Sequence, residues 1–335
     1  MNPSSSNIIK HKAAVETVFE VPNRLELYAP REDSKSNLYV CSRAGEVIKF
    51  NEKGDYQVLF SLPGQPSCIA FENKEEIKSQ ESQKDNINNN SGSELGETFY
   101  ISDVANSLIY CKKTTNTEET NVLVKDYEGY PLKGPTSLAI NNESNSILFC
   151  DGGYFEATSL NNPTGSLFSV ELDTQNIQPI LLNCLSYPSD IFFDNIIGIG
   201  YVSETFSNRL LRITENPQGV YHASVFYCFN GRLGPSSVAC DDEGNVYVSR
   251  FEYQNKEGSV DGLISVINKE GILIGEIQVP KMSEITGMYI PRRFYDESKE
   301  GEAPKIPQIL YFTERNFNGV KKIKLQQFRQ EIEKL

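Results

Sequence analysis

Apolar and polar residues alternate along most of the chain, in short runs separated by Gly, Asn, Asp and Pro. A period of two residues indicates strands with one face buried, because successive side chains of a strand point to opposite sides. Gly244 and Gly271 fall in two of the predicted turns, where tight hairpins need a positive φ. The four strands joined around these turns are Ser237–Cys240, Val246–Arg250, Gly262–Asn268 and Ile272–Val279. The pattern predicts an all-β protein.

One short motif recurs along the chain: an aromatic residue, a small or β-branched residue, and then Ser, Thr, Cys or Asp. Its six copies are Tyr39–Ser42, Tyr100–Asp103, Phe149–Gly152, Tyr201–Glu204, Tyr247–Arg250 and Tyr311–Glu314. Aromatic and β-branched residues favour strands because they pack well on a pleated surface. Each copy is therefore expected to be one buried strand of a repeated unit.

A second motif precedes every copy of the first: Pro, two polar or small residues, and an apolar residue. Its copies are Pro22–Leu25, Pro66–Ile69, Pro135–Leu138, Pro188–Ile191, Pro235–Val238 and, with Ile in place of Pro, Ile285–Met288. A period of roughly 45 residues with four strands per unit is typical of β-propeller blades. The two motifs together predict a six-bladed β-propeller; an open sandwich of similar strands is the alternative.

The domain limits follow from the repeat. Residues 15–328 are expected to form the propeller, preceded by a polar arm at 1–14 and followed by a charged tail at 329–335. Two polar insertions, 73–97 and 292–307, lengthen the second and sixth units, and such composition cannot offset its ordering entropy by burial. Because the sixth unit has only three strands, Val15–Val21 is expected to pair with Ile323–Phe328 and close the ring.

Composition and charge narrow the function classes. The 335 residues carry a net charge of −13, and an acidic surface repels nucleic-acid phosphates. No run of apolar residues reaches the roughly 20 needed to span a bilayer. The first residues lack the apolar core of a signal peptide. We therefore expect no nucleic-acid partner, no membrane insertion and a cytoplasmic location.

Residues at the start of the innermost strands should surround the mouth of the central channel. They are expected to be Asn23, Ser67, Thr136, Ser137, Ser189, Asp190, Ser236, Ser237 and Thr286. Hydroxyl groups dominate this set, and we expect them to hydrogen-bond strand-end backbone groups. Ca²⁺ takes about six oxygen ligands, several of them carboxylates. Only Asn23, Asp190 and Glu284 are strong candidate ligands, so no cofactor is expected.

Candidates for catalysis are equally few. The two histidines, His11 and His222, fall before the first unit and in an outer strand, away from the channel serines, which argues against a Ser-His-Asp arrangement. Glu204 and Glu314 follow equivalent strands, where a hydrogen-bonding structural role is favoured over acid–base chemistry. Asp190 and Glu284 are the remaining catalytic candidates.

The repeat resembles a known family. Leu38–Lys49, Gly165–Val170 and Tyr201–Arg212 are similar to the strictosidine synthase-like branch of the calcium-dependent phosphotriesterase superfamily, which includes gluconolactonases and paraoxonases; NHL-repeat propellers are also similar. The resemblance implies six blades. It also implies that Asn or Asp residues after the Pro motif bind a metal, and only Asp190 is of this type at that position. The resemblance further implies that Glu284 corresponds to the catalytic carboxylate of strictosidine synthases.

Two functions follow from these observations. The first is a non-catalytic propeller that serves as a protein-interaction scaffold or structural subunit, since the channel mouth lacks the family ligands and catalytic His. A scaffold of this kind is expected to bind protein partners. By analogy with ciliary assemblies, the cilium or cytoskeleton is a further expected location. The alternative is a divergent hydrolase or strictosidine synthase-like enzyme, using Ca²⁺ and a small organic substrate at the channel. The sequence favours the scaffold.

Overall fold

A computed structural model of the chain describes residues 8–22, 26–33, 36–51, 53–71, 97–231, 234–251, 261–291, 308–332 and 334. Residues 73–96 and 292–307, which hold nearly all of the two predicted insertions, lie outside the described residues, as does Asn23. Within the described part, no helix is long and apolar enough to cross a membrane.

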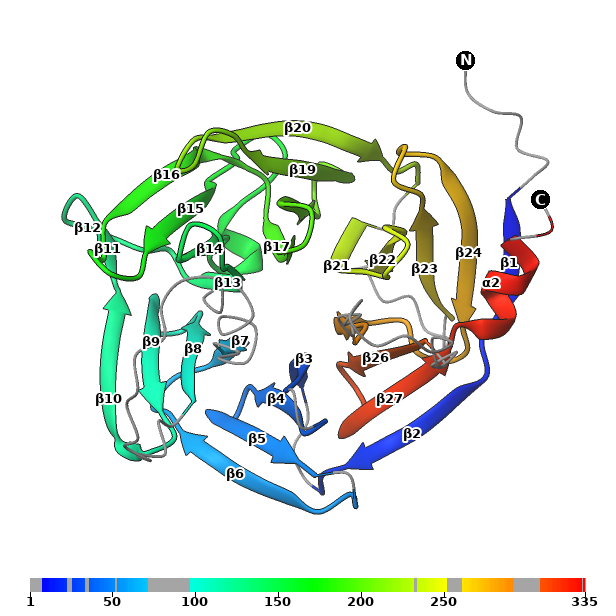
Figure 1. Cartoon of the computed structure of the whole chain (residues 1–335), viewed down its shortest axis with the longest axis horizontal. Coiled ribbons are helices and arrows are strands. Elements are labelled where there is room, and N and C mark those ends of the chain that lie inside the picture. Colours follow the sequence, from blue (N-terminus) through cyan, green and yellow to red (C-terminus); the bar gives the residue numbers. More distant parts are fainter. Residues whose placement is uncertain are drawn as a thin grey trace, which may run out of the picture.

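Six antiparallel sheets are arranged around a central axis, as the repeat predicted (Figure 1). The first blade contains β3 (Leu27–Glu32), β4 (Leu38–Ser42), β5 (Glu46–Phe50) and β6 (Tyr56–Ser61). The second contains β7 (Pro66–Phe71), β8 (Thr98–Asp103), β9 (Leu108–Lys113) and β10 (Asn116–Val124). The third contains β13 (Pro135–Asn141), β14 (Ser146–Asp151), β15 (Gly165–Glu171) and β16 (Ile177–Leu185). In each blade the first strand lies nearest the axis.

The remaining three blades repeat this form. The fourth contains β17 (Pro188–Asp194), β18 (Ile199–Glu204), β19 (Arg209–Glu215) and β20 (Tyr221–Cys228). The fifth contains β21 (Gly234–Cys240), β22 (Val246–Phe251), β23 (Gly262–Ile267) and β24 (Leu273–Val279). The sixth contains β25 (Ile285–Tyr289), β26 (Ile309–Glu314) and β27 (Gly319–Lys324). A small hairpin, β11 (Asp126–Tyr127) and β12 (Tyr130–Pro131), links the second and third blades, and η1 (Phe155–Ala157) is a single 3₁₀ turn.

The N-terminal strand completes the sixth blade. In the described chain β2 (Val15–Glu20) pairs antiparallel with β27, with Val15 opposite Ile323 and Glu20 opposite Gly319. The ring of Phe19 in β2 stacks on Phe50 of the first blade, with centroids 4.6 Å apart. The predicted closure of the ring by the opening segment is thus confirmed.

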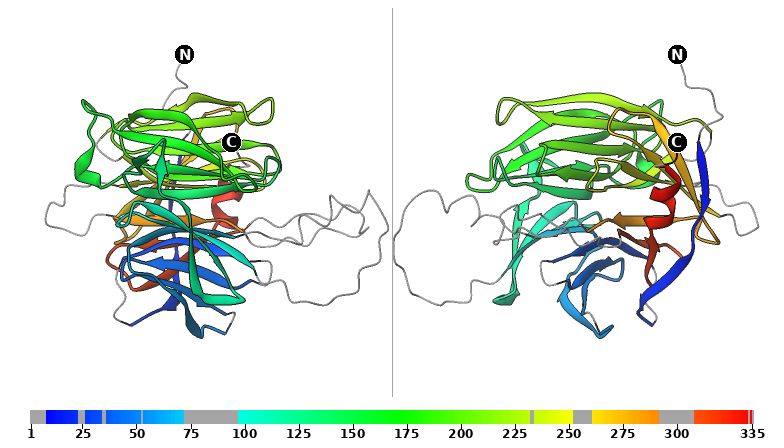
Figure 2. Two further views of the ribbon diagram at one scale, coloured as in Figure 1. Left: turned by 90° about the vertical axis from the view of Figure 1, so that its left-hand side faces the viewer. Right: turned by 45° about the vertical axis from the view of Figure 1, so that its right-hand side comes forward.

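Both ends of the described chain pack against the fifth blade. Within the segment expected to be a polar arm, β1 (Ile9–Lys12) adds a parallel fifth strand to β24. The C-terminal helix α2 (Gln326–Ile332) lies beside β1 (Figure 2) and buries Phe328 in the same cluster that Ile9 contacts. A Cβ on Gly275 would approach the Phe328 ring to 2.6 Å, so β24 needs glycine there.

The hydrophobic core is divided among the blade interfaces. The second strands β4, β8, β14 and β22 are buried along their whole length, which explains their aromatic and β-branched motif. Outer strands such as β20 are largely exposed. Buried apolar residues form six clusters, and each lies between two neighbouring blades.

Carboxylates at the ends of second strands hold the loops that enter the inner strands. Asp103 accepts a hydrogen bond from the Gln65 amide at 2.9 Å, and Glu204 accepts one from Ser186 at 2.7 Å. Asp151 accepts from the amides of Lys133 and Gly134 at 2.9 and 2.8 Å. Burial raises the pKa of Asp151, and these amides work against that rise. The hydrogen-bonding role predicted for Glu204 is confirmed.

Replacing Asp151 with Ala should lower the free energy of unfolding by about 2–4 kcal/mol, since two buried amides lose their acceptor. Asp151→Asn keeps one oxygen and should lose less. Urea denaturation measures both. Asp173→Ala, at an exposed position, is the matched control. An Asp151→Ala loss no larger than that of the control would contradict the capping role.

Candidate functional site

Hydroxyl side chains form a ring at the entrance of the axial channel. Each donates to the backbone oxygen of the residue that begins the next blade. The pairs are Ser67 to Pro135 at 2.8 Å, Thr136 to Pro188 at 2.7 Å, Ser189 to Pro235 at 3.4 Å, Ser236 to Ile285 at 3.1 Å and Thr286 to Leu27 at 2.6 Å. These hydroxyls bond strand-end backbone, as the sequence predicted.

In the first blade, Tyr28 occupies the ring position that Ser or Thr occupies in the other blades. Thr286 donates to Leu27, which is therefore the equivalent of the prolines that begin the other inner strands. Leu27 also pairs with Ser42 just as Pro66 pairs with Asp103. The placement of Asn23 in the ring is corrected accordingly: the motif at Pro22 is five residues out of register, and the position belongs to Tyr28.

Asp190 lies in a buried layer below the hydroxyl ring and joins three blades. Its Oδ1 accepts from Ser137 Oγ at 2.6 Å and from its neighbour Ile191 N at 2.9 Å. Its Oδ2 accepts from Ser237 Oγ at 2.6 Å and from Val238 N at 2.9 Å. Four donors thus occupy its two oxygens, which leaves the carboxylate poorly suited to bind a metal or take a proton.

Arg31 divides the axial channel into two cavities. It lines a cavity of about 280 Å³ at the hydroxyl ring and another of about 220 Å³ on the opposite side. Its guanidinium donates to the Pro30 carbonyl at 2.9 Å. Burial works to lower the pKa of Arg31, but the Cys68 thiol and the Asp190 carboxylate outweigh burial and raise it. Arg31 thus remains charged and partitions the channel.

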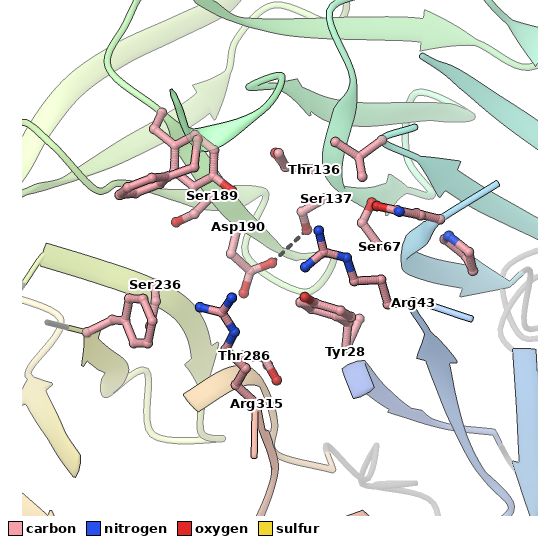
Figure 3. Close-up of a pocket in the computed structure, with 18 of the residues that line it drawn as sticks. Tyr28, Arg43, Ser67, Thr136, Ser137, Ser189, Asp190, Ser236, Thr286 and Arg315 are labelled. Atoms are coloured by element: carbon pink, nitrogen blue, oxygen red, sulfur yellow. Dashed lines mark hydrogen bonds between the residues drawn. The ribbon is translucent and has the colours of Figure 1, made fainter. Parts of the chain in front are cut away.

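Two Glu–Arg pairs stand at the mouth of the larger cavity. Arg43 Nη1 donates to Glu26 Oε2 at 2.5 Å, while Arg315 contacts Glu26 through Nε at 3.4 Å and Glu284 through Nη1 at 3.5 Å. In Figure 3 both guanidinium groups project toward the middle of the cavity, where the Asp190–Ser137 hydrogen bond is drawn. Glu284 therefore joins the mouth, apart from Asp190.

The two pairs occupy equivalent places in neighbouring blades. Arg43 N donates to the Glu26 carbonyl at 3.1 Å, and Arg315 N to the Glu284 carbonyl at 3.0 Å. Each Arg is the residue after a second-strand motif, and each Glu is the residue before an inner strand. Other blades place Val104, Gly152, Thr205 and Phe251 at the Arg position. The fold therefore does not itself require arginine there.

An aromatic cap covers one side of the larger cavity. Phe155 of η1 packs edge-on against Tyr187, with centroids 5.1 Å apart, and also against Phe206 at 4.6 Å. Burial chiefly raises the pKa of Tyr187, to about 12, and the nearby Tyr28 and Glu156 add to the rise. Tyr187 thus stays protonated near neutral pH and keeps its hydroxyl donor.

The backbone around the cavity is conformationally strained. Glu26, Ala29 and Tyr187 have φ values of +57°, +48° and +60°, in the left-handed region that residues with a Cβ seldom adopt. Such conformations cost about 1–3 kcal/mol and tend to gather at functional sites. Eight other non-glycine residues of the described chain also have a positive φ, so this kind of strain is distributed around the propeller and does not by itself mark the cavity.

The donor set does not fit a calcium ion. Among the described residues there is no group of three His, Cys, Asp or Glu that could hold a metal. The ring hydroxyls donate to backbone, Asp190 accepts four hydrogen bonds, and Glu26 and Glu284 contact arginines. Ca²⁺ requires several free oxygens converging on one point. No step of the chemistry below therefore passes through a metal.

The sequence located part of this site. The structure brings Ser137, Asp190 and Ser237 together and sets Glu284 beside Arg315. It adds further cavity residues that the motifs did not single out, namely Tyr28, Arg43, Glu156, Tyr187 and Arg315. Reading the second-strand motif one residue further would have found both arginines.

Curated relatives match only part of the chain. No protein-family model matches it. Over 127 residues it is 32% identical to lactonase drp35 of Staphylococcus aureus (strain MRSA252) and of Staphylococcus haemolyticus (strain JCSC1435). The match covers 37% of this chain and 36% of each relative, so the chain spans about a third of the length of these lactonases.

Solved structures match nearly the whole chain. Regucalcin from Agrobacterium tumefaciens, described as a calcium-binding protein, has a TM-score of 0.67 at 18% identity, covering 94% of this chain and 95% of its own. A gluconolactonase from Xanthomonas campestris has a TM-score of 0.64 at 14% identity, covering 97% and 93%. A luciferin-regenerating enzyme has a TM-score of 0.65 at 14% identity, covering 93% and 95%. The chain has the fold of these gluconolactonase- and regucalcin-type six-bladed propellers, as its resemblance implied.

These relatives correct the functional interpretation. The sequence favoured a non-catalytic scaffold and leaned against an enzyme, yet the curated relatives that match part of the chain are lactonases. The scaffold interpretation is therefore wrong. It rested on the missing family ligands and did not count the cavity side chains that lie one position outside the repeated motifs, Arg43, Tyr187 and Arg315.

Calcium should leave the stability of the protein unchanged. A ligand that binds only the folded state raises Tm, and about 10 mM CaCl₂ would reveal even a weak site. We expect the same Tm in CaCl₂, in MgCl₂ of equal ionic strength and in EDTA, measured by differential scanning calorimetry. A rise of several degrees specific to Ca²⁺ would show that the donor set has been misjudged.

Proposed function

We propose that the protein is a hydrolase that opens a small lactone or related ester in the larger axial cavity. The observation that carries this proposal is the cavity itself, about 280 Å³, in which phenol and guanidinium donors face a carboxylate. The lactonase and gluconolactonase relatives support the same reaction class. Since one fold can host many activities, the argument depends on the side chains of the site.

Hydrogen-bond donors for the substrate carbonyl come from the phenols. Tyr28 and Tyr187 both line the cavity. Burial raises the pKa of each, so both hydroxyls remain protonated at neutral pH. Attack on an ester carbonyl places negative charge on its oxygen, and fixed donors stabilise that charge where bulk water is partly excluded. Tyr187, held by the aromatic cap, is the better oriented of the two.

Glu156 is the carboxylate best placed to accept a proton from water. It lines the cavity from η1 and has no hydrogen-bond or ion-pair partner among the described residues. Its charge helps to raise the pKa of Tyr187, which lines the same cavity. Asp190 accepts four hydrogen bonds, and Glu26 and Glu284 contact arginines, so none of these three carboxylates serves as readily.

The reaction then needs only water and the chain's own residues. Glu156 takes a proton from a water molecule, whose oxygen attacks the carbonyl carbon. The ring C–O bond breaks, and the departing alkoxide takes the proton from Glu156. The product is a hydroxy acid, which loses its proton to solvent at neutral pH.

Two substitutions test this assignment. Glu156→Gln removes the base and should lower kcat about 100-fold or more. Tyr187→Phe keeps the ring in the cap and loses the hydroxyl, and it should lower kcat about 100-fold. Initial rates of acid release from a panel of γ-lactones, δ-lactones and aryl esters, measured in a weakly buffered indicator assay, provide the measurement.

The controls match each change in chemistry. Glu118→Gln and Tyr130→Phe alter exposed side chains of β10 and the β11–β12 hairpin, and they should retain the parental rate. Circular dichroism verifies that each variant is folded. If the parental protein hydrolyses none of the panel above the buffer rate, or if Glu156→Gln matches Glu118→Gln, the proposal fails.

A further inference from the structure

The larger cavity gathers arginine side chains in an acidic protein. The whole chain has 45 acidic and 32 basic side chains. The cavity lining contains three arginines, Arg31, Arg43 and Arg315, together with the carboxylates of Glu156 and Asp190. Glu26 and Glu284 pair with the two mouth arginines, so an anion would be recognised there by guanidinium hydrogen bonds and not by an excess of positive charge.

The two mouth arginines retain donors for a ligand. Arg43 donates to Glu26 through Nη1 and also interacts with the Tyr28 side chain, and Arg315 donates through Nε and Nη1. Because a guanidinium group carries five N–H donors, these contacts leave donors on each arginine for a ligand. Their side chains are 44% and 45% exposed, so both guanidinium groups are open to solvent, whereas the side chains of Glu26 and Glu284 are 22% and 6% exposed.

Both arginines stand at a position that is occupied by an uncharged residue in the other four blades. The equivalent residues Val104, Gly152, Thr205 and Phe251 are uncharged. The same loop hydrogen bond forms without arginine, as Val104 N does with Gln65 O at 3.1 Å and Thr205 N with Tyr187 O at 3.0 Å. Figure 3 shows the guanidinium groups of Arg43 and Arg315 projecting into the cavity, and the glutamates that contact them do not belong to the cavity lining.

We infer that Arg43 and Arg315 form an anion-binding subsite that recognises a carboxylate or phosphate group of a small organic ligand. Guanidinium groups match the geometry of both oxyanions through paired N–H donors. This inference rests on the proposed function only in naming that ligand as the substrate or product. A lactone that carries a second acidic group would be the preferred substrate, bound with its anion at the arginines and its ester carbonyl at Tyr187.

Isothermal titration calorimetry of the whole protein tests binding without requiring turnover. The probes are D-gluconate, D-glucose 6-phosphate and the neutral polyol D-glucitol. We expect one or both anions to bind and D-glucitol to bind at least tenfold more weakly. Arg43→Gln and Arg315→Gln should each weaken the anion about 10- to 100-fold, the loss expected for a charged hydrogen bond. Arg212→Gln, at an exposed position of β19, should bind as the parent.

A further variant separates binding from structural support. Glu26→Gln removes the negative charge that competes for Arg43, so anion binding should become tighter, by about threefold or more. If the arginines only hold the loops together, Glu26→Gln would weaken binding instead. Arg43→Lys keeps the charge and should bind with intermediate affinity, which guards against misfolding of Arg43→Gln.

The outcomes distinguish this inference from the proposed function. Anion binding by a protein that hydrolyses no lactone would keep the subsite and overturn the hydrolase. Hydrolysis of neutral lactones without preferential anion binding would keep the hydrolase and overturn the subsite. Equal affinity for gluconate and glucitol, or unchanged affinity in both arginine variants, contradicts the inference. The anion that binds more tightly shows whether the subsite prefers a carboxylate or a phosphate group.

Discussion

The closed ring of blades depends on hydrogen bonds that pass from one inner strand to the next. In blades two to six, a hydroxyl near the start of the inner strand donates to a carbonyl at the start of the following inner strand, and Thr286 of the sixth blade donates in this way to Leu27 of the first. In the first blade the Tyr28 hydroxyl donates to Glu26 instead. Because each blade buries its apolar faces only against its neighbours, a gap between two blades would expose the apolar faces of both. These bonds also consume the hydroxyls, which makes the ring a structural feature and not a ligand set.

The side chains available for binding and catalysis are those that take no part in the hydroxyl ring. The positions directly before the inner strands and directly after the second strands lie at the axial mouth, and their backbones are already hydrogen-bonded to each other in the loops. Their side chains can therefore change from blade to blade at little cost to the fold. In blades six and one they have become a Glu–Arg pair, and in blade four a tyrosine.

The repeat made the fold predictable, whereas the site was only partly so. Aromatic and β-branched second strands are needed wherever a strand is buried on both faces, so their spacing revealed all six blades. The first blade misled because Pro22 imitates the motif five residues before the true strand start at Leu27. Arg43 and Arg315 were missed because the repeat was defined by residues that all six copies share. The position that these arginines occupy carries a different residue in the other blades.

Charge distribution sets how a ligand would reach this cavity. At physiological salt, fields are screened within about 8 Å, so an approaching anion first meets a surface dominated by carboxylates. The arginines act only once the anion has entered the mouth, where hydrogen bonds and partial desolvation strengthen the attraction. Selection therefore depends on contact with Arg43 and Arg315 rather than on long-range steering. A strongly acidic protein can in this way bind an anion through guanidinium contacts that act at short range.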